Sequence, residues 1–290
     1  MNNVTIQAAI IAAAVALIVA VINQLVSVAN QILTHRLTQR RETQKYYNDV
    51  YQKLFAPIIA DVFLYMDMVS NFRRGHDTSP EIEIKVKDRA IEYIGNNLLY
   101  GSPVLITAHR KISSARFKDE TGFNPLPIEI FFLLEFVNEY GYVIRQSSIF
   151  SDNKQRQQME IVEKYKILYL LCAYGFEDLL RYSSWFNEKA YSSRTYQKLH
   201  KLLKYNRDHE RDHERKLSKN IGSARELLNE GTNDKSIDDQ VSIANIVEEK
   251  YKEMSAILSR HYKDMIKKML YLLIKDKKDK IRISRELQLD

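Results

Sequence analysis

The sequence predicts an all-α protein, with a single N-terminal transmembrane helix followed by a multi-helix cytoplasmic bundle that has a long C-terminal amphipathic helix. Residues 1–34 carry no charged side chain. No proline follows Pro127, and a long segment without proline favours helices because proline breaks them. No stretch alternates apolar and polar residues for long enough to predict a sheet, and we expect even IEIKVK (residues 82–87) to be helical.

The membrane segment is predicted at residues 4–28, which include an unbroken apolar run from Ala8 to Ile22. A helix of this length, at about 1.5 Å per residue, spans a bilayer core of roughly 30 Å. The alternatives are a buried core helix and a cleaved signal peptide, for which Ser27-Val28-Ala29 would be the cleavage site. A signal peptide begins with basic residues, whereas MNNVTIQ has none, so the sequence favours a retained signal-anchor.

The charges that flank this segment predict its orientation. A group of mostly basic residues follows it directly, whereas the residues before it carry no basic side chain. The positive-inside rule then places the N-terminus outside and residues 35–290 in the cytoplasm, as a single-pass protein of the inner (plasma) membrane. The one cysteine, Cys172, agrees with a reducing compartment. The flanking residues are His35, Arg36, Arg40, Arg41 and Lys45, opposed by Glu42.

One face of the predicted membrane helix combines small and polar residues. Small residues let helices approach closely, and polar side chains bond across the contact. We therefore expect a homo-oligomer held through this face. One form of this oligomer encloses a water-filled path. The alternative is an alanine-rich anchor that becomes polar where it leaves the bilayer. The predicted oligomerisation residues are Ala8, Ala12, Ala16, Ala20, Asn23, Ser27, Asn30 and Gln31.

Four segments follow from the remaining pattern: the transmembrane helix (4–28), a helical stalk (29–48), a helical bundle (49–190), and a charged helical hairpin or coiled-coil-like region (191–290). Within the bundle, Pro57 should kink or restart a helix. Helices should begin after Ser79 and Ser102, because serine followed by proline is a common helix start. A further helix is expected from about residue 154 to about residue 181. In the last segment, one amphipathic helix is expected from Ile243 to Leu273.

RDHERDHER (residues 207–215) contains His209-Glu210-Arg211-Asp212-His213, which matches the H-E-x-x-H pattern of zinc proteases. A catalytic zinc helix packs one face against a cleft, but residues 206–216 include no apolar side chain. Opposite charges three residues apart instead predict a solvent-exposed helix with ion pairs such as Asp212–Arg215. We therefore expect no metal and no cofactor.

The pairs Arg207-Asp208…His213 and Arg194…His200 resemble the short Arg–His motif of HEPN ribonucleases. That resemblance implies RNA cleavage without a metal at a dimer interface. It covers one short motif, and chance alone yields about as many such pairs. No Walker loop, G-x-G-x-x-G, C-x-x-C or G-x-S-x-G motif occurs.

The C-terminal region is basic, within a chain whose net charge is +7. Basic charge on an amphipathic helix binds anionic lipid, phosphates of nucleic acid, or only water. The predicted contact residues are Lys267, Lys268, Lys275, Lys277, Lys278, Lys280 and Arg282.

Together these features predict a non-enzymatic, membrane-anchored, self-associating helical scaffold or signalling module, whose partners are the bilayer, further copies of the chain and a cytoplasmic protein. Nucleic acid is a weaker alternative partner. Two other functions stay open. One is an oligomerising effector that permeabilises the bilayer, an architecture similar to that of effectors in bacterial antiviral defence. The other is a membrane-tethered HEPN-like ribonuclease.

Overall fold

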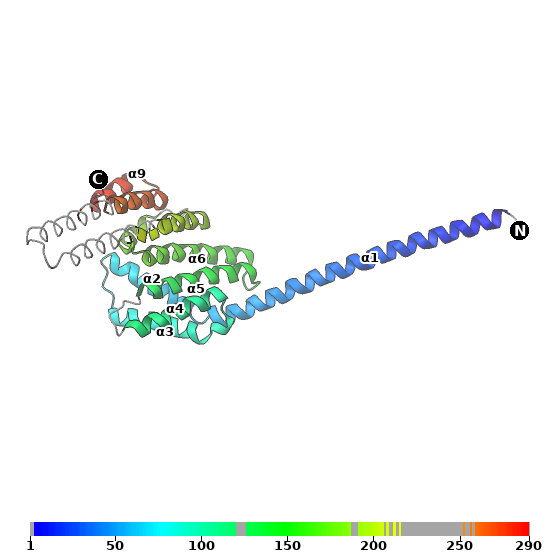
Figure 1. Cartoon of the computed structure of the whole chain (residues 1–290), viewed down its shortest axis with the longest axis horizontal. Coiled ribbons are helices and arrows are strands. Elements are labelled where there is room, and N and C mark those ends of the chain that lie inside the picture. Colours follow the sequence, from blue (N-terminus) through cyan, green and yellow to red (C-terminus); the bar gives the residue numbers. More distant parts are fainter. Residues whose placement is uncertain are drawn as a thin grey trace, which may run out of the picture.

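The computed structural model is helical throughout the residues that it describes, and no strand occurs among them. It describes residues 3–119, 126–186, 191–205 and 259–289, together with single residues between 207 and 256. For residues 3–16, 18, 20 and 117–119 it describes the backbone alone. The prediction of an all-α fold is thereby confirmed. A long rod, α1, projects from a bundle built by the other helices (Figure 1).

Helix α1 (Asn3–Val50) runs through the predicted membrane segment and the predicted stalk without a break. Its 48 residues correspond to roughly 70 Å at about 1.5 Å per residue. Where side chains are described, no single helix is both long and apolar enough to cross a membrane. The segment Val21–Phe55 with Ile59–Arg73 satisfies the criterion only as a pair, bent by 52°.

The junction between α1 and the bundle is a π-helical turn, η1 (Tyr51–Phe55), followed by Pro57. Proline has no N–H and its ring crowds the carbonyl four residues before it, which is that of Lys53. The Tyr93 hydroxyl donates to this Lys53 carbonyl at 2.9 Å and so replaces the missing helical hydrogen bond. The prediction that Pro57 restarts the helix is confirmed, since α2 (Ile59–Arg73) begins two residues later.

Two further helices begin where the serine–proline pairs predict. Helix α3 (Pro80–Asn96) has Pro80 as its first residue, and it includes IEIKVK, which is helical as expected. Helix α4 (Pro103–Asp119) follows a short 3-10 turn, η2 (Leu98–Tyr100). The Ser102 hydroxyl caps α4 by accepting from the Leu105 N–H at 3.3 Å.

The centre of the bundle is the pair α5 (Leu126–Gln146) and α6 (Asp152–Ala173), which pack against each other along their length. Both bury large apolar side chains, among them Phe132, Phe136, Tyr140 and Tyr169. The Tyr169 hydroxyl donates to the Val62 carbonyl of α2 at 2.6 Å. This bond keeps the one polar atom of a fully buried ring satisfied.

Helix α6 ends at Ala173, so the expectation that it continues to about residue 181 is wrong. Gly175 has a φ of +78°, a conformation that favours glycine, and the Phe176 N–H donates to the Leu171 carbonyl at 2.9 Å. This arrangement is a Schellman motif, which terminates a helix. The chain continues as a 3-10 segment, η3 (Glu177–Trp185).

The C-terminal part of the chain packs on the same core. Residues 193–205 and 259–273 are helical, and α9 (Lys277–Glu286) follows after a break. The Asp276 side chain caps the start of α9. Apolar side chains on both sides of residue 190 belong to one buried cluster. Of the expected amphipathic helix from Ile243 to Leu273, residues 243–251, 253–255, 257 and 258 lie outside the described residues. From the C-terminal part, the cluster includes Leu199, Leu203, Met265, Met269, Leu273 and Ile283.

Candidate functional site

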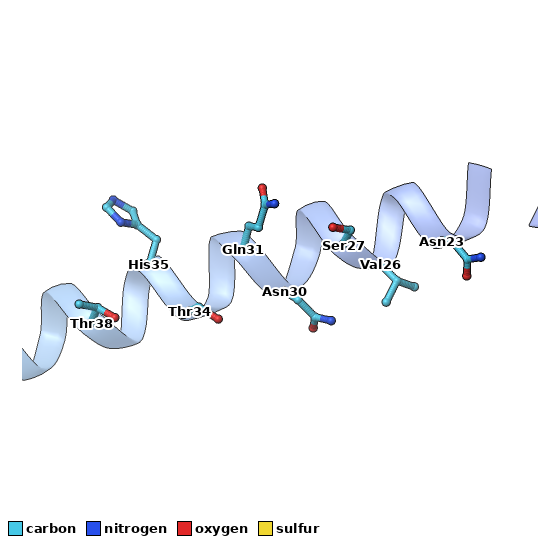
Figure 2. A pocket seen from close by; sticks show the side chains of 8 residues that line it. All are labelled: Asn23, Val26, Ser27, Asn30, Gln31, Thr34, His35 and Thr38. Atoms are coloured by element: carbon cyan, nitrogen blue, oxygen red, sulfur yellow. The ribbon is translucent and has the colours of Figure 1, made fainter. Parts of the chain in front are cut away.

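The first candidate site is the face of α1 that carries polar side chains. Asn23, Ser27, Asn30 and Gln31, all predicted for oligomerisation, line one shallow groove along the helix. Figure 2 shows Val26 and Asn30 at one edge of this groove and Gln31 and His35 at the other. We call this surface, completed by Thr34 and Thr38, the polar face of α1. Ala8, Ala12, Ala16 and Ala20 lie outside the residues whose side chains the structure describes.

Away from the polar face, most of the described side chains of α1 between Leu17 and Leu33 are apolar and uncovered by the rest of the chain. The side chains of Leu17, Leu25 and Leu33 are 68%, 66% and 57% exposed. Contiguous exposed apolar surface of this kind marks contact with a membrane or with another protein. From residue 21 to residue 43 every side chain of α1 is exposed, and burial begins only where α1 meets α5.

The second candidate site is a cleft of about 840 Å³ in the bundle, which we call the cationic cleft. Its walls come from α4, from the beginning of α5, from the end of α6 and from residues 200–211. Apolar side chains form much of the lining, a composition typical of sites for small molecules. The polar lining side chains are Lys111, Glu135, Tyr174, His200, Arg207 and Arg211.

Arg207 is held in this cleft by two aromatic rings. Its guanidinium carbon lies 5.2 Å from the centre of the Phe131 ring and 4.8 Å from that of Tyr174. These are cation–π contacts, which engage the face of the guanidinium and leave its N–H edge available. The Nε atom of Arg207 is buried and has no hydrogen-bond partner among the described residues. The expectation that residues 206–216 are entirely solvated is therefore wrong at Arg207.

Burial and mutual repulsion shape the electrostatics of the cleft. Burial lowers the pKa of His200, and the nearby positive charges of Lys204 and Arg207 lower it further. Burial raises the pKa of Glu135, an effect opposed by a hydrogen bond from Asn138 and by the charges of Lys166 and Lys111. In the described part of its lining, the cleft therefore gathers positive charge around one carboxyl group whose ionisation is disfavoured.

Hydrogen bonds on one side fix the helical segment that carries His200. The Ser193 hydroxyl donates to Glu163 at 2.8 Å, and Asn138 donates to the Tyr196 hydroxyl at 3.2 Å. The Lys166 ammonium lies 4.3 Å from the centre of the Tyr196 ring. These contacts anchor residues 193–205 on α5 and α6, which gives the cleft a rigid wall.

The structure does not assemble a metal centre among the residues that it describes. His209, Glu210 and His213 of the H-E-x-x-H match lie outside those residues. The expected pair of Asp212 and Arg215 occurs, at 4.0 Å and with both side chains exposed. Of the residues that resemble the HEPN motif, Arg194 is exposed, whereas His200 and Arg207 line the cationic cleft.

The basic C-terminal residues are distributed over several environments. The Lys280 ammonium lies 4.5 Å from the centre of the Tyr271 ring, and the Arg282 guanidinium lies 4.9 Å from that of Trp185 and donates to Glu286 at 3.0 Å. Figure 1 shows α9 on the side of the bundle away from the free part of α1. Their contact with lipid or another polyanion stays a prediction. The other residues predicted for this contact, all exposed except the half-buried Lys267, are Lys267, Lys268, Lys275, Lys277 and Lys278.

The composition of the cationic cleft was missed by sequence reasoning. Its residues come from four separate segments. Only Gly175, which ends α6 beside Tyr174, gives a local sequence signal, and that signal indicates the end of a helix. Comparison with known proteins adds nothing to these sites, because no family model, no curated protein and no solved structure matches the chain.

Proposed function

We propose that the protein is a membrane-anchored helical scaffold that self-associates through α1 and presents its bundle at the cytoplasmic face of the membrane. The observation that carries this proposal is the uncovered apolar surface of α1 from Leu17 to Leu33, beside which the described polar side chains gather on one face. Lipid covers the apolar surface, and a second copy of α1 covers the polar face. The N-terminus lies outside and the bundle inside, as the flanking basic charge favours.

The spacing on the polar face supports pairing with another copy of the same helix. Asn23, Ser27, Asn30 and Thr34 follow one another at steps of four, three and four residues, which is the spacing of a coiled-coil seam. An asparagine in such a seam bonds to its counterpart and fixes register and oligomeric state. Bonds of this kind between transmembrane helices contribute about 1 kcal/mol each.

Cysteine cross-linking in isolated membranes tests this proposal. The single native thiol, Cys172, is buried, so an introduced cysteine reports alone. Asn30→Cys should form a disulfide-linked dimer on mild oxidation, because Asn30 faces its counterpart. Ile32→Cys is the matched control, since two residues further along a helix the side chain points to the opposite side. Equal cross-linking of the two variants, or none, would contradict self-association through this face.

A separate measurement tests the membrane anchor. The full chain should stay in the membrane fraction after alkaline extraction, and added protease should digest the bundle only in inverted vesicles. Release of the chain by alkali would rule out an anchor, and digestion in right-side-out vesicles would rule out the proposed orientation.

The polar face also favours one second candidate, an oligomeric effector that permeabilises the bilayer. In a higher oligomer, Asn23, Ser27 and Asn30 would line a central path in place of lipid. Expression should then collapse the membrane potential, and Ser27→Leu should restore it. An intact potential in cells that contain the cross-linked oligomer would exclude this candidate and leave the scaffold.

A further inference from the structure

We infer that the cationic cleft binds a water-soluble nucleoside phosphate, with its phosphate on Arg207 and Lys111 and its planar base against the apolar wall. Only the choice of a soluble ligand over a membrane lipid rests on the proposed function of α1. The inference otherwise rests on the residues that line the cleft and on an unsatisfied donor within it.

The unsatisfied donor is the Nε of Arg207, which is buried without a hydrogen-bond partner in the described part of the chain. A buried polar group without a partner is uncommon and indicates a missing ion, ligand or water. With Phe131 and Tyr174 fixing the guanidinium, the N–H edge of Arg207 is preorganised to bind two oxygens of a phosphate. Arginine held by two rings loses little further freedom on binding.

The charge of the cleft also favours an anion. Lys111 from α4 and Arg211 line the cleft with Arg207, and none of the three has a carboxylate within ion-pair distance among the described residues. Among the lining residues that the structure describes, Glu135 is the single carboxylate, and it accepts from Asn138. Among the described residues the cleft therefore carries more positive than negative charge, which concentrates anions there.

The size and the apolar walls indicate more than a bare phosphate. A cleft of about 840 Å³ lies within the range that holds ligands the size of drugs and cofactors. Ala108, Pro127 and Ile128, which line the cleft and are not fully buried, offer apolar contact area, which a nucleobase covers and a phosphate ion does not.

The position of the cleft favours a soluble ligand over a membrane lipid. The bundle end of α1 contacts α5 near Tyr142, whereas the nearest cleft residue on the same helix is Glu135, which is seven residues earlier. At about 1.5 Å per residue, this places the near edge of the cleft roughly 10 Å further from the α1 junction. The headgroups of the bilayer that α1 enters are more distant still, beyond the exposed part of the helix.

Isothermal titration calorimetry of the full chain in detergent micelles tests the inference, with ATP, adenosine and inorganic phosphate as separate probes. ATP should bind saturably, phosphate more weakly, and adenosine weakest of all. Arg207→Gln and Lys111→Gln should each weaken ATP binding by about tenfold or more, as expected for the loss of a charged hydrogen bond. Lys198→Gln is the matched control, because Lys198 is an exposed cation outside the cleft.

Several results would overturn the inference. They are the absence of saturable ATP binding, equal weakening by the control variant, and equal affinity for phosphate and ATP. Tighter binding of short-chain phosphatidic acid than of ATP would assign the cleft to a lipid headgroup and also overturn it. Because Lys111 is exposed, its substitution gives an answer even if Arg207→Gln impairs folding.

Discussion

Asn48 of α1 and Ser148, which follows α5, are joined by two hydrogen bonds. The Asn48 amide donates to the Ser148 hydroxyl at 3.2 Å, and the Ser148 backbone N–H donates to the Asn48 side-chain oxygen at 3.1 Å. From the residue directly before Asn48, the Tyr47 hydroxyl donates to that of Tyr142 at 3.2 Å. These bonds attach the last turn of α1 to the end of α5, so that a rotation of α1 moves the centre of the bundle with it.

Asn48→Ala should loosen this attachment without unfolding the bundle. The two lost bonds correspond to about 1–2 kcal/mol in total, because a typical hydrogen bond contributes about 1 kcal/mol. Amide exchange should therefore accelerate in residues 44–50 and at Ser148, and stay unchanged in α6. Thr43→Ala, an exposed position five residues earlier, is the control. Unchanged exchange in Asn48→Ala would show that the contact does not hold α1.

Glu129 should be the most sensitive charged residue of the bundle. It is only 2% exposed, and it binds the Lys87 ammonium at 2.5 Å and the Arg116 guanidinium at 2.7 Å. Glu129→Ala leaves both cations without their buried partner and should lower the free energy of unfolding by about 3 kcal/mol or more.

Asp88→Ala is the matched control, because Asp88 pairs with the same Arg116 at 2.8 Å on the surface. Exposed ion pairs contribute less than about 1 kcal/mol, so this variant should be close to the wild type. Chemical denaturation in detergent measures both variants. Equal losses would show that burial does not decide the strength of these pairs.

The helix boundaries that could be predicted are those set by local chemistry. Serine followed by proline located the starts of α3 and α4, because proline suits a first helical residue, which needs no N–H hydrogen bond. The Ser102 hydroxyl also caps α4, whereas Ser79 makes no side-chain capping bond to α3. The end of α6 is harder to predict. The apolar pattern continues past Gly175 and favours a longer helix, whereas the glycine ends it.

The polar face and the cationic cleft differ in how many of their residues the sequence alone brings together. The polar face of α1 lies on one helix, so a period of 3.6 residues is enough to align Asn23, Ser27 and Asn30. The cleft joins Lys111, Phe131, Tyr174 and Arg207 from separate segments. Their approach depends on how α4, α5 and α6 pack, which no local pattern encodes. The sequence predicts a solvent-exposed side chain for Arg207, because residues 206–216 are all polar.

Gly141 and Gly95 should respond in opposite ways to substitution by alanine. A Cβ atom at Gly141 would lie 2.8 Å from Cγ1 of Val162, on the neighbouring helix α6. That overlap forces α5 and α6 apart, so Gly141→Ala should destabilise the protein by about 1–3 kcal/mol despite the helix propensity of alanine.

At Gly95 a Cβ atom would meet the ring of His109, with Nε2 at 2.6 Å and Cε1 at 3.2 Å, and this ring ends a half-exposed side chain that can rotate away. Gly95→Ala should therefore be neutral or stabilising by up to about 1 kcal/mol. Thermal unfolding of both variants checks the difference. A loss of stability in Gly95→Ala as large as that in Gly141→Ala would contradict the argument from side-chain mobility.

Glu139 should make stability depend on pH in mildly acidic solution. Its carboxylate accepts from the Ser102 N–H at 2.7 Å and from the Ser102 hydroxyl at 2.5 Å. Burial nevertheless raises its pKa, more than these two bonds lower it, so the native state keeps the proton to a higher pH than the unfolded chain does. Stability from this group is therefore complete below the ordinary pKa of 4.5 and is lost as pH rises through the native value.

Glu139→Gln removes this titration and keeps an oxygen that accepts from Ser102. The free energy of unfolding of the variant, relative to that of the wild type, should therefore rise as pH increases from 4.5 through the native pKa of Glu139, and then become constant. Glu160→Gln, an exposed position on α6, is the control. Urea denaturation between about pH 4 and pH 8 measures the difference. A difference that falls with rising pH would mean that the Ser102 bonds, rather than burial, determine the pKa of Glu139.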